Sequence, residues 1–415
     1  MSLSTTDVRI VPLPQAQDVL TEVLRLGAQQ LLAQAIEAEV ADWIDLHRQC
    51  LDDHGHRQVV RNGHLPARTI TTGVGSVAVQ QPRVQDRRAA EQREKFSSTL
   101  LPPYLRKTKS VEELIPWLYL KGVSTGDFSE ALAALLGPEA KGLSASTVTR
   151  LKGIWEQEYQ DWSKRSLAGK QYVYVWADGV YFNIRLEGGR QCILVLMGAT
   201  ADGKKELLAI QDGQRESELS WKELLLDVQA RGLTLAPAVA IGDGALGFWK
   251  ALRQVWTTTQ EQRCWVHKTA NVLDKLPQSV QPKAKERLHA IYLAPSRAEA
   301  EKAFDLFVRI YEAKYPKATE CLAKDRKQLL TFYDFPAEHW LHLRTTNVIE
   351  SVFATVRLRT DKTKGTGTRV ACLTMVFKLL ESAARRWRAL NGSPLLAEVI
   401  HGVVFVDGVK QEDAA

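Results

Sequence analysis

The strongest constraint in this sequence is a run of three β-rich segments between residues 168 and 211. They read QYVYVWADGVYFNIRL, RQCILVLMGA and KKELLAIQ, and their β-branched, aromatic and aliphatic residues favour strands. Gly188-Gly189 and Asp202-Gly203 separate the segments, and such dipeptides are typical of tight hairpin turns. We therefore predict an antiparallel meander of three strands.

The segments that follow predict helices and strands in alternation. Apolar periodicity indicates a helix at 218–230, a strand at 237–241, a helix at 245–255 and a short strand at 262–266. The resulting order, β-β-β-α-β-α-β, is typical of an α/β layer with a mixed sheet. Residues 268–335 return to helical periodicity, which predicts an all-helical insertion, and a last amphipathic helix is expected at 369–390.

The part of the chain before residue 168 is predicted to be mainly helical. We expect a helix at 14–50, a hairpin around Gly73-Val74-Gly75 within 61–84 that ends at Pro82, and helices within 110–162. Ser144 is a suitable cap for a helix that carries Arg150 and Lys152 near its start. That arrangement is compatible with a helix-turn-helix reader of DNA and equally with a plain helical bundle.

The charge of the chain favours a polyanionic partner. The formal net charge is +7, and ten Lys or Arg residues stand against three Asp or Glu residues between 344 and 388. Such a run suits nucleic acid, although a solvated helix face has the same composition. Five scattered cysteines, an N-terminus without signal-peptide features and the lack of an apolar stretch of ~20 residues predict a reduced, cytosolic protein.

Two Asp-Gly pairs in or after predicted strands carry the first candidate catalytic acids. Asp178 lies inside the first strand, where no turn follows and an unpaired carboxylate is costly, so a divalent cation is a fitting partner. Asp243 belongs to GDGALG, residues 242–247, which also matches the GxGxxG dinucleotide fingerprint. We reject that interpretation, because a meander precedes the motif and an aspartate would repel the pyrophosphate.

Glu350 is the candidate third acid. It lies in RTTNVIESVFATVRLR, residues 344–359, where Asn347 and Glu350 could form a capping box at the start of a helix. Alternatively, Glu350 completes a metal site, because two cations ~4 Å apart generally need a further acidic ligand. The two interpretations are compatible, since the first turn of a helix is a well-defined place for a carboxylate.

These motifs, taken in chain order, resemble a known family. ADG at 177–179, GDG at 242–244, CWVH at 264–267 and TTNVIES at 345–351 are similar to motifs of the Asp-Asp-Glu transposases with a ribonuclease H-like core. They are closer still to the Mutator-type transposases of bacterial insertion sequences. The hairpin at 61–84 and the segment at 100–128 also resemble that family, so the resemblance spans residues 20–390.

The resemblance implies a DNA transposase that cleaves and transfers strands without a covalent enzyme intermediate. Asp178, Asp243 and Glu350 would be catalytic and would ligate two Mg²⁺ ions, for which Mn²⁺ would substitute. Cys264, His267 and Asn347 would support the site. Half of a zinc site and direct catalysis are alternatives for the Cys-x-x-His pair. No small-molecule cofactor is expected.

The expected partner is double-stranded DNA, both the terminal inverted repeats and the target. Trp340 would either stack on a flipped base or pack in the insertion, and packing is favoured. We also expect a homodimer, because two element ends must be paired, no membrane association, and a bacterial cytoplasmic location on the nucleoid when DNA is bound. The candidate phosphate contacts are Arg150, Lys152, Arg357, Arg359, Lys362, Lys364 and Arg369.

Two other functions stay open: a ribonuclease H-like nuclease without strand transfer, and a DNA-binding regulator with a degenerate core. The intact set of three acids argues against the regulator. The long N-terminal region and the helical insertion argue against a minimal nuclease.

The expected fold class is α/β, with a ribonuclease H-like mixed sheet, an all-α insertion and an N-terminal helical and hairpin region that binds DNA. Seven parts are expected. They are a helical region (1–58), a hairpin and basic linker (59–109), a helix-turn-helix-like region (110–167), the first part of the core (168–267), the insertion (268–338), the last core helices (339–390) and a C-terminal tail (391–415).

Overall fold

The computed structural model describes residues 19–120, 123, 127–136, 145–184, 189–213, 215–244, 246–362 and 368–411. The chain divides into two compact units, Met1–Val148 and Thr149–Ala415, whose boundary falls inside helix α4 (Ala145–Ser163). Three predictions lie outside the described residues: the cap Ser144, the beginning of the helix at 14–50, and Lys364. The finer division into seven parts stays a prediction.

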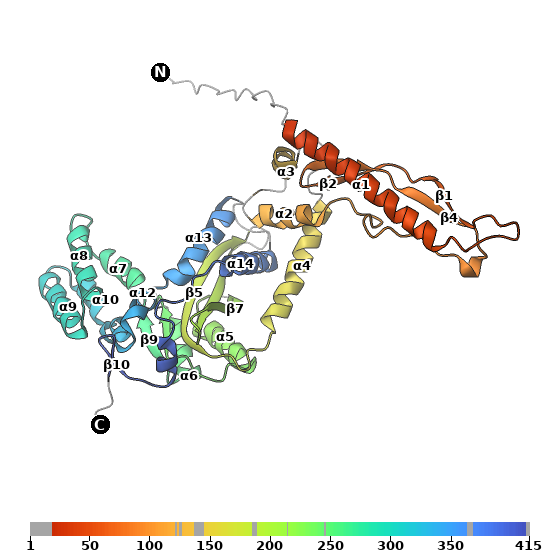
Figure 1. The fold of residues 1–415 in the computed structure, drawn as a ribbon. Coiled ribbons are helices and arrows are strands. Elements are labelled where there is room, and N and C mark those ends of the chain that lie inside the picture. The colour runs from red at the N-terminus through yellow and green to blue at the C-terminus, as the bar shows by residue number, and fades with distance from the viewer. Residues whose placement is uncertain are drawn as a thin grey trace, which may run out of the picture. The chain divides into compact units, whose positions relative to one another are not determined.

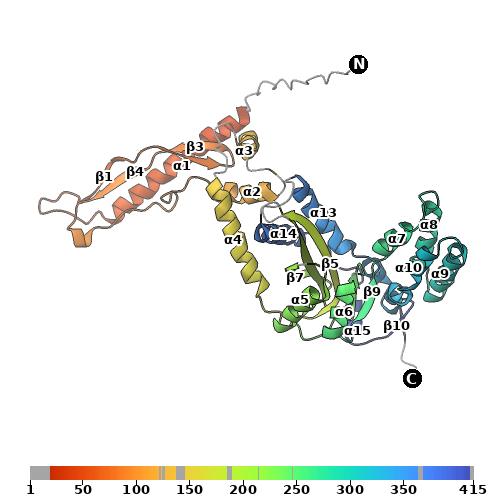
Figure 2. The same cartoon turned by 180° about the vertical axis from the view of Figure 1, so that it is seen from behind.

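One long helix and two strand pairs build most of the first unit. Helix α1 (Val19–Leu46) lies along the strands in both views (Figure 1, Figure 2). Its buried residues Ile36 and Val40 face the strands, and Ile36 packs with Ile70 and Val77. The antiparallel pairs are β1 (Val59–His64) with β4 (Pro82–Asp86) and β2 (Arg68–Thr72) with β3 (Gly75–Val79).

The predicted hairpin is therefore confirmed as β2 and β3, but the prediction for Pro82 is wrong. Pro82 begins β4 instead of ending the strand structure, and its partner in β1 is His64. A proline is tolerated there because it is the first residue of the strand and its missing N–H removes no bond from the middle of a ladder.

Helices follow the strands, as the periodicity predicts. They are η1 (Ala90–Gln92), α2 (Lys109–Leu120), α3 (Phe128–Leu136) and α4. Val111, Ile115 and Phe128 are buried within the unit, whereas the side chains of Arg150 and Lys152 on α4 are exposed.

A five-stranded mixed sheet forms the centre of the second unit, which confirms the predicted α/β class. The strand order is β7-β6-β5-β8-β9. The first three strands form the predicted antiparallel meander, β8 pairs with β5 in parallel, and β9 pairs with β8 in parallel. The strands are β5 (Tyr172–Ile184), β6 (Gly189–Thr200), β7 (Lys205–Gly213), β8 (Val239–Gly242) and β9 (Gln260–Arg263).

The two faces of β5 have different neighbours, because successive side chains of a strand point to opposite faces. Val175 and Ala177 pack in the core with helices α5 (Glu218–Ala230) and α6 (Leu246–Val255). Trp176, on the other face, donates a hydrogen bond from its ring to the His342 carbonyl. Helices α13 (Asn347–Lys362) and α14 (Arg369–Ala384) also contact the sheet. Asp178 shares the face of Trp176.

The helical insertion predicted at 268–335 is confirmed. Its buried Lys268 forms an ion pair with Asp325, which also pairs with Arg263 at 2.6 Å. The helices are α7 (Trp265–Leu273), α8 (Gln281–Tyr292), α9 (Arg297–Tyr311), α10 (Pro316–Ala323), α11 (Arg326–Leu329) and η2 (Thr331–Asp334), followed by η3 (Ala337–His339) and α12 (Trp340–Leu343).

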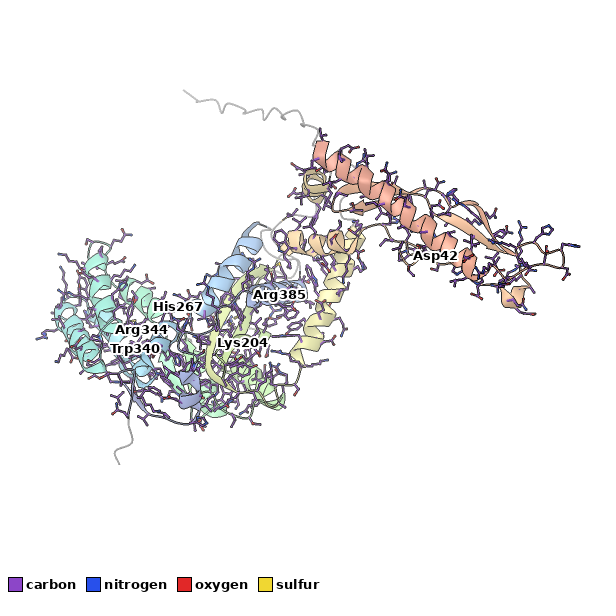
Figure 3. All side chains as sticks on the ribbon, viewed as in Figure 1. Asp42, Lys204, His267, Trp340, Arg344 and Arg385 are labelled. Atoms are coloured by element: carbon purple, nitrogen blue, oxygen red, sulfur yellow. The ribbon has the colours of Figure 1, made fainter. Side chains whose placement is uncertain are left out.

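Trp340 packs, as favoured from the sequence. It is 8% exposed, lies edge-on to Phe332 and Tyr333, and donates a hydrogen bond from its ring to the Phe335 carbonyl. The Arg344 guanidinium lies 5.1 Å from its ring centre, and both residues are labelled in Figure 3. These contacts occupy the ring, so base stacking is not needed to explain this tryptophan.

The C-terminal segment is more structured than a tail. The helix expected at 369–390 ends at Ala384, and the Leu390 N–H instead donates to the Gly203 carbonyl. Helix α15 (Leu395–Ile400) and the strand pair β10 (Phe405–Val406) and β11 (Val409–Lys410) follow. Within the described residues, every helix is too short or too polar to cross a membrane.

Candidate active site

Strand pairing brings the first two predicted acids to the same part of the sheet. Asp178 lies on β5, and Asp243 comes directly after β8, which runs parallel to β5 with Gly242 beside Ala177. Because β8 ends at Gly242, Asp243 leaves the sheet next to Asp178. Asp178 is only 7% exposed, whereas Asp243 is half-buried.

Helix α13 brings the third acid to this place. Glu350 lies in the first turn of α13, which packs against β5. Burial, and then the negative charges of Asp243 and Glu350, raise the pKa of Asp178 to about 7, against a lowering by His267. Asp243 and Glu350, from elements far apart in the sequence, therefore lie close enough to Asp178 to repel its charge.

Thr346 holds Glu350 in its position. The carbonyl of this fully buried threonine accepts the N–H groups of Ile349 and Glu350, and its hydroxyl donates to the Glu350 Oε1 at 2.6 Å. Asn347 begins α13, as expected, but its side chain is exposed and Thr346 occupies the capping position. The predicted capping box is therefore wrong, because the residue that precedes the helix is Thr346 and not Asn347.

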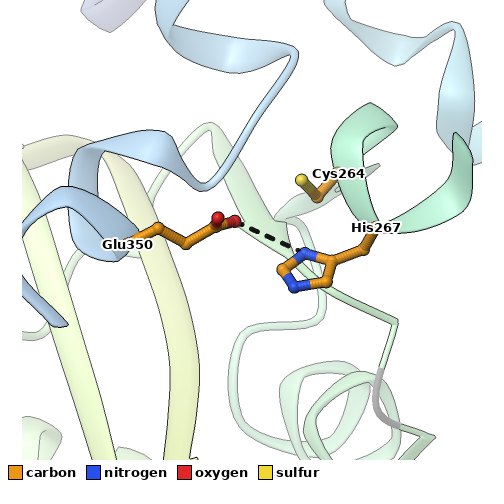
Figure 4. Close-up of side chains that lie close together, drawn as sticks. All are labelled: Cys264, His267 and Glu350. Atoms are coloured by element: carbon orange, nitrogen blue, oxygen red, sulfur yellow. Dashed lines mark ion pairs between the residues drawn. The ribbon is translucent and has the colours of Figure 1, made fainter. Parts of the chain in front are cut away.

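The Cys-x-x-His motif lies beside Glu350 (Figure 4). The sequence predicts it in a strand, but β9 ends at Arg263, and Cys264 is the cap of α7 with His267 in its first turn. That spacing puts both side chains on one side of the helix start. The Thr346 N–H donates to the Cys264 Sγ at 3.3 Å, and the His267 Nδ1 lies 3.6 Å from the Glu350 Oε1.

The surroundings of His267 favour its protonated form. The hydrogen-bonded Cys264 sulfur, together with the charges of Glu350 and Asp178, raises the pKa of His267 to about 9 against the opposing effect of burial. The ligand atoms of Cys264, His267 and Glu350 lie within 4.8 Å of one another, which is close enough for a metal. The same contacts suit His267 as a positively charged partner of Glu350, so the geometry is compatible with both the supporting role and a metal-ligand role for the pair.

The glycines around Asp243 have packing roles. Gly244 has a φ of +95° and lies directly against the Arg263 guanidinium, so a side chain there would be strained and would clash. A Cβ on Gly247 would lie 2.5 Å from the Glu216 carbonyl oxygen. Close packing explains these glycines without a bound dinucleotide, in agreement with the rejection of the GxGxxG fingerprint.

Sequence reasoning missed two residues of this site, Thr346 and Glu216. Thr346 stands four residues before Glu350, the spacing of helical neighbours, and that spacing could have found it. Glu216 lies in the polar loop between β7 and α5, and its carboxyl group lies against the backbone of Gly179. No local pattern marks Glu216, because its place in the site depends on its contact with Gly179, which is distant in sequence.

The predicted phosphate contacts differ in their surroundings. The side chains of Arg150, Lys152 and Arg357 are exposed. Arg369 is instead bonded to both carboxylate oxygens of Asp212, at 2.9 and 2.5 Å. The side chains of Arg359, Lys362 and Lys364 lie outside what the structure describes. A role in DNA binding stays a prediction for all seven.

The donor set of the site fits a hard divalent cation. The carboxylates of Asp243, after β8, and Glu350, at the start of α13, act on the buried Asp178 of β5 and, together with burial, raise its pKa. Magnesium and manganese prefer oxygen ligands, and a bound cation would remove this repulsion.

Comparisons with known proteins agree on one family. The family model described as "Transposase, Mutator family" matches residues 4–389. The chain is 52% identical over 298 residues to the transposase for insertion sequence element IS6120 of Mycolicibacterium smegmatis, covering 72% of this chain and 92% of that one. It is 52% identical over 287 residues to the transposase for insertion sequence element IST2 of Acidithiobacillus ferrooxidans, covering 68% and 95%.

Proposed function

The chain belongs to the Mutator family of transposases, and we propose that Asp178, Asp243 and Glu350 carry out its DNA strand cleavage and strand transfer. The observation that carries this proposal is their convergence. The three acids come from β5, the end of β8 and α13, and the charges of Asp243 and Glu350 act on the buried Asp178. Structural packing alone gives no reason to gather three carboxylates in a half-buried place.

The three acids would hold two Mg²⁺ ions, or Mn²⁺ in their place. Bound cations of this kind activate the attacking oxygen and stabilise the leaving oxygen of a phosphodiester. The chain itself contributes orientation. Thr346 fixes the Glu350 carboxylate by a hydrogen bond of 2.6 Å, and the His267 ring places a positive charge 3.6 Å from it.

The core of the second unit is proposed to be ribonuclease H-like. Support comes from a three-stranded meander, two parallel strands added beside β5, and acids on the central strand, after β8 and on a late helix. The helical insertion between Asp243 and Glu350 lengthens the chain between the second and third acids without separating them in space.

The substrate is proposed to be double-stranded DNA, with the terminal inverted repeats of the element as the specific sites. The exposed basic residues Arg150, Lys152 and Arg357 suit phosphate contacts. A homodimer would pair the two ends of the element. The place of action would be the bacterial cytoplasm, on the nucleoid, without a small-molecule cofactor.

The deciding experiment is a cleavage and strand-transfer assay on terminal inverted-repeat DNA with Mg²⁺. We expect the Glu350→Gln variant to bind this DNA as well as the wild type does and to lose both reactions. Retention of either reaction at the wild-type rate would refute the assignment of the three acids. Cleavage by the wild type without strand transfer would indicate a nuclease, and DNA binding without either reaction would indicate a regulator.

A further inference from the structure

Glu216 is a carboxylate of the proposed site that the three-acid assignment leaves unused. It precedes α5, whose cap Ser217 accepts the Ser220 N–H. Its backbone N–H approaches the Tyr181 hydroxyl at 3.4 Å, and its carbonyl lies against Gly247 at the start of α6. The loop is therefore fixed at three points, and Glu216 projects from a defined place.

The side chain of Glu216 lies across β5 at the residue next to Asp178. A Cβ built on Gly179 would lie 2.5 Å from the Glu216 Cδ and 2.6 Å from its Oε1. Only a glycine leaves room for a carboxyl group at that point. Gly179 is not needed for a turn, because β5 continues beyond it. Its role is to leave space for Glu216.

The charges of Asp243 and Asp178 also act on Glu216. Burial, and then the charges of Asp243 and Asp178, raise the pKa of Glu216 to about 7, while a hydrogen bond from the Tyr181 hydroxyl opposes them. A glutamate with a surface role would be free to turn into solvent, where it would avoid this repulsion. Glu216 instead stays half-buried beside two like charges.

We infer that Glu216 is a fourth carboxylate of the cation-binding cluster, reaching the cations from the side of β5 opposite Glu350. This inference rests on the proposed function, because it assigns Glu216 to the same cations. Asp178 points to the face of β5 that α13 contacts, and Glu216 lies against Gly179 on the opposite face. The pairing of β5 with β8 ends at Ala177, so at this edge of β5 the cations would be within reach of carboxylates from both faces of the strand.

The test is Mn²⁺ binding by the full-length, metal-free protein without DNA, followed by the EPR signal of free Mn²⁺. Glu216→Gln removes the charge and keeps the shape. Glu223→Gln is the matched control, since Glu223 is an exposed glutamate on α5. We expect Glu216→Gln to bind Mn²⁺ about tenfold more weakly or worse, and Glu223→Gln to titrate like the wild type.

A second variant tests the same idea with every carboxylate retained. Gly179→Ala would push the Glu216 carboxyl group away, because the new methyl group would occupy its place. We expect this variant to weaken Mn²⁺ binding like Glu216→Gln. For both variants, the rise in melting temperature caused by Mn²⁺ gives a second readout that is valid even if the metal-free variant is less stable.

The inference fails if Glu216→Gln and Gly179→Ala bind Mn²⁺ like the wild type. In that case Glu350→Gln would still weaken Mn²⁺ binding and abolish cleavage if the proposed function is right. If Glu350→Gln instead leaves both Mn²⁺ binding and DNA cleavage unchanged, the assignment of the three acids itself is wrong. The two failures are therefore distinguishable.

Discussion

The Glu350 carboxylate depends on one buried hydroxyl group. Thr346 is fully buried, and its Oγ1 lies 2.6 Å from the Glu350 Oε1, 3.3 Å from the Cys264 Sγ and 3.4 Å from the His267 Nδ1. The threonine thus connects the Cys-x-x-His motif to the proposed catalytic acid. Cys264 and His267 act on Glu350 in part through this residue, which makes Thr346 a positioning residue.

Replacing Thr346 by valine tests this role, because valine keeps the shape and removes the hydroxyl. A lost hydrogen bond to a charged group costs about 2 kcal/mol, so single-turnover cleavage should slow about tenfold to thirtyfold. DNA affinity should not change. Thr346→Ser keeps the hydroxyl and is expected to stay within about threefold of the wild type. Equal rates for valine and serine variants would contradict the positioning role.

Asp178 should make the metal-free protein less stable as pH rises. Its pKa in the folded protein is about 7, raised mainly by burial and then by Asp243, so the folded state binds its proton more tightly than the unfolded chain does. Stability is therefore lost as pH rises above the ordinary aspartate pKa of 3.8, and the loss is complete above pH 7. The cost is on the order of 4 kcal/mol.

The measurement is the melting temperature in EDTA at several pH values, for the wild type and for Asp178→Asn. The asparagine variant should gain stability relative to the wild type as pH rises from about 5 to about 8. Added Mg²⁺ should stabilise the wild type most at the higher pH. Parallel melting profiles for the two proteins would rule out this account of Asp178.

At the scale of elements, periodicity and turn residues predicted most of the second unit. The meander, α5, α6 and the helical insertion lie where apolar spacing indicates them, since each element is encoded locally. The end of β9 was not predictable, because Cys264 leaves the strand to cap α7 and apolar residues continue past it. Likewise α14 ends at Ala384, and the later Leu390 bonds to Gly203, a contact distant in sequence.

The site was predicted only where a residue type is unusual for its element. Asp178 in a strand and Asp243 at a strand end are such cases, and the structure brings both together with Glu350. Glu216 and Thr346 have ordinary local surroundings. Glu216 depends on a tertiary contact with Gly179 that no spacing in the sequence reveals, whereas the four-residue spacing of Thr346 and Glu350 could have indicated Thr346 but not its contact with Cys264.

A buried cation joins two parts of the insertion, and this contact gives a stability prediction. Lys268 on α7 is fully buried and forms an ion pair with Asp325 and a hydrogen bond with the Cys321 carbonyl at 2.7 Å. Lys268→Met should lower the free energy of unfolding by about 3 kcal/mol, because it leaves Asp325 with Arg263 alone.

Urea unfolding followed by circular dichroism measures this change. Lys275→Met is the control, since Lys275 is an exposed lysine shortly after α7. The control should unfold within about 0.5 kcal/mol of the wild type. If both variants unfold alike, the buried ion pair does not stabilise the fold.

At the scale of the whole molecule, basic residues that form ion pairs within the fold must be distinguished from those that are exposed and suited to DNA binding. The net charge of +7 does not show which residues meet phosphates. The Arg369 guanidinium is bonded to both oxygens of Asp212, which ties the start of α14 to β7, whereas Arg150 and Lys152 extend from α4 with exposed side chains. These two groups should therefore respond differently to salt.

We predict that replacing both Arg150 and Lys152 by glutamine weakens binding to any DNA sequence and lowers the slope of log affinity against log salt by about two. Arg369→Gln should leave that slope unchanged and instead lower the melting temperature, because Asp212 loses its partner. Fluorescence anisotropy with a labelled duplex at several salt concentrations measures the slopes. A lower slope for Arg369→Gln alone would show that phosphate competes successfully with Asp212, and that the charge of the α14 start belongs to the DNA-binding surface.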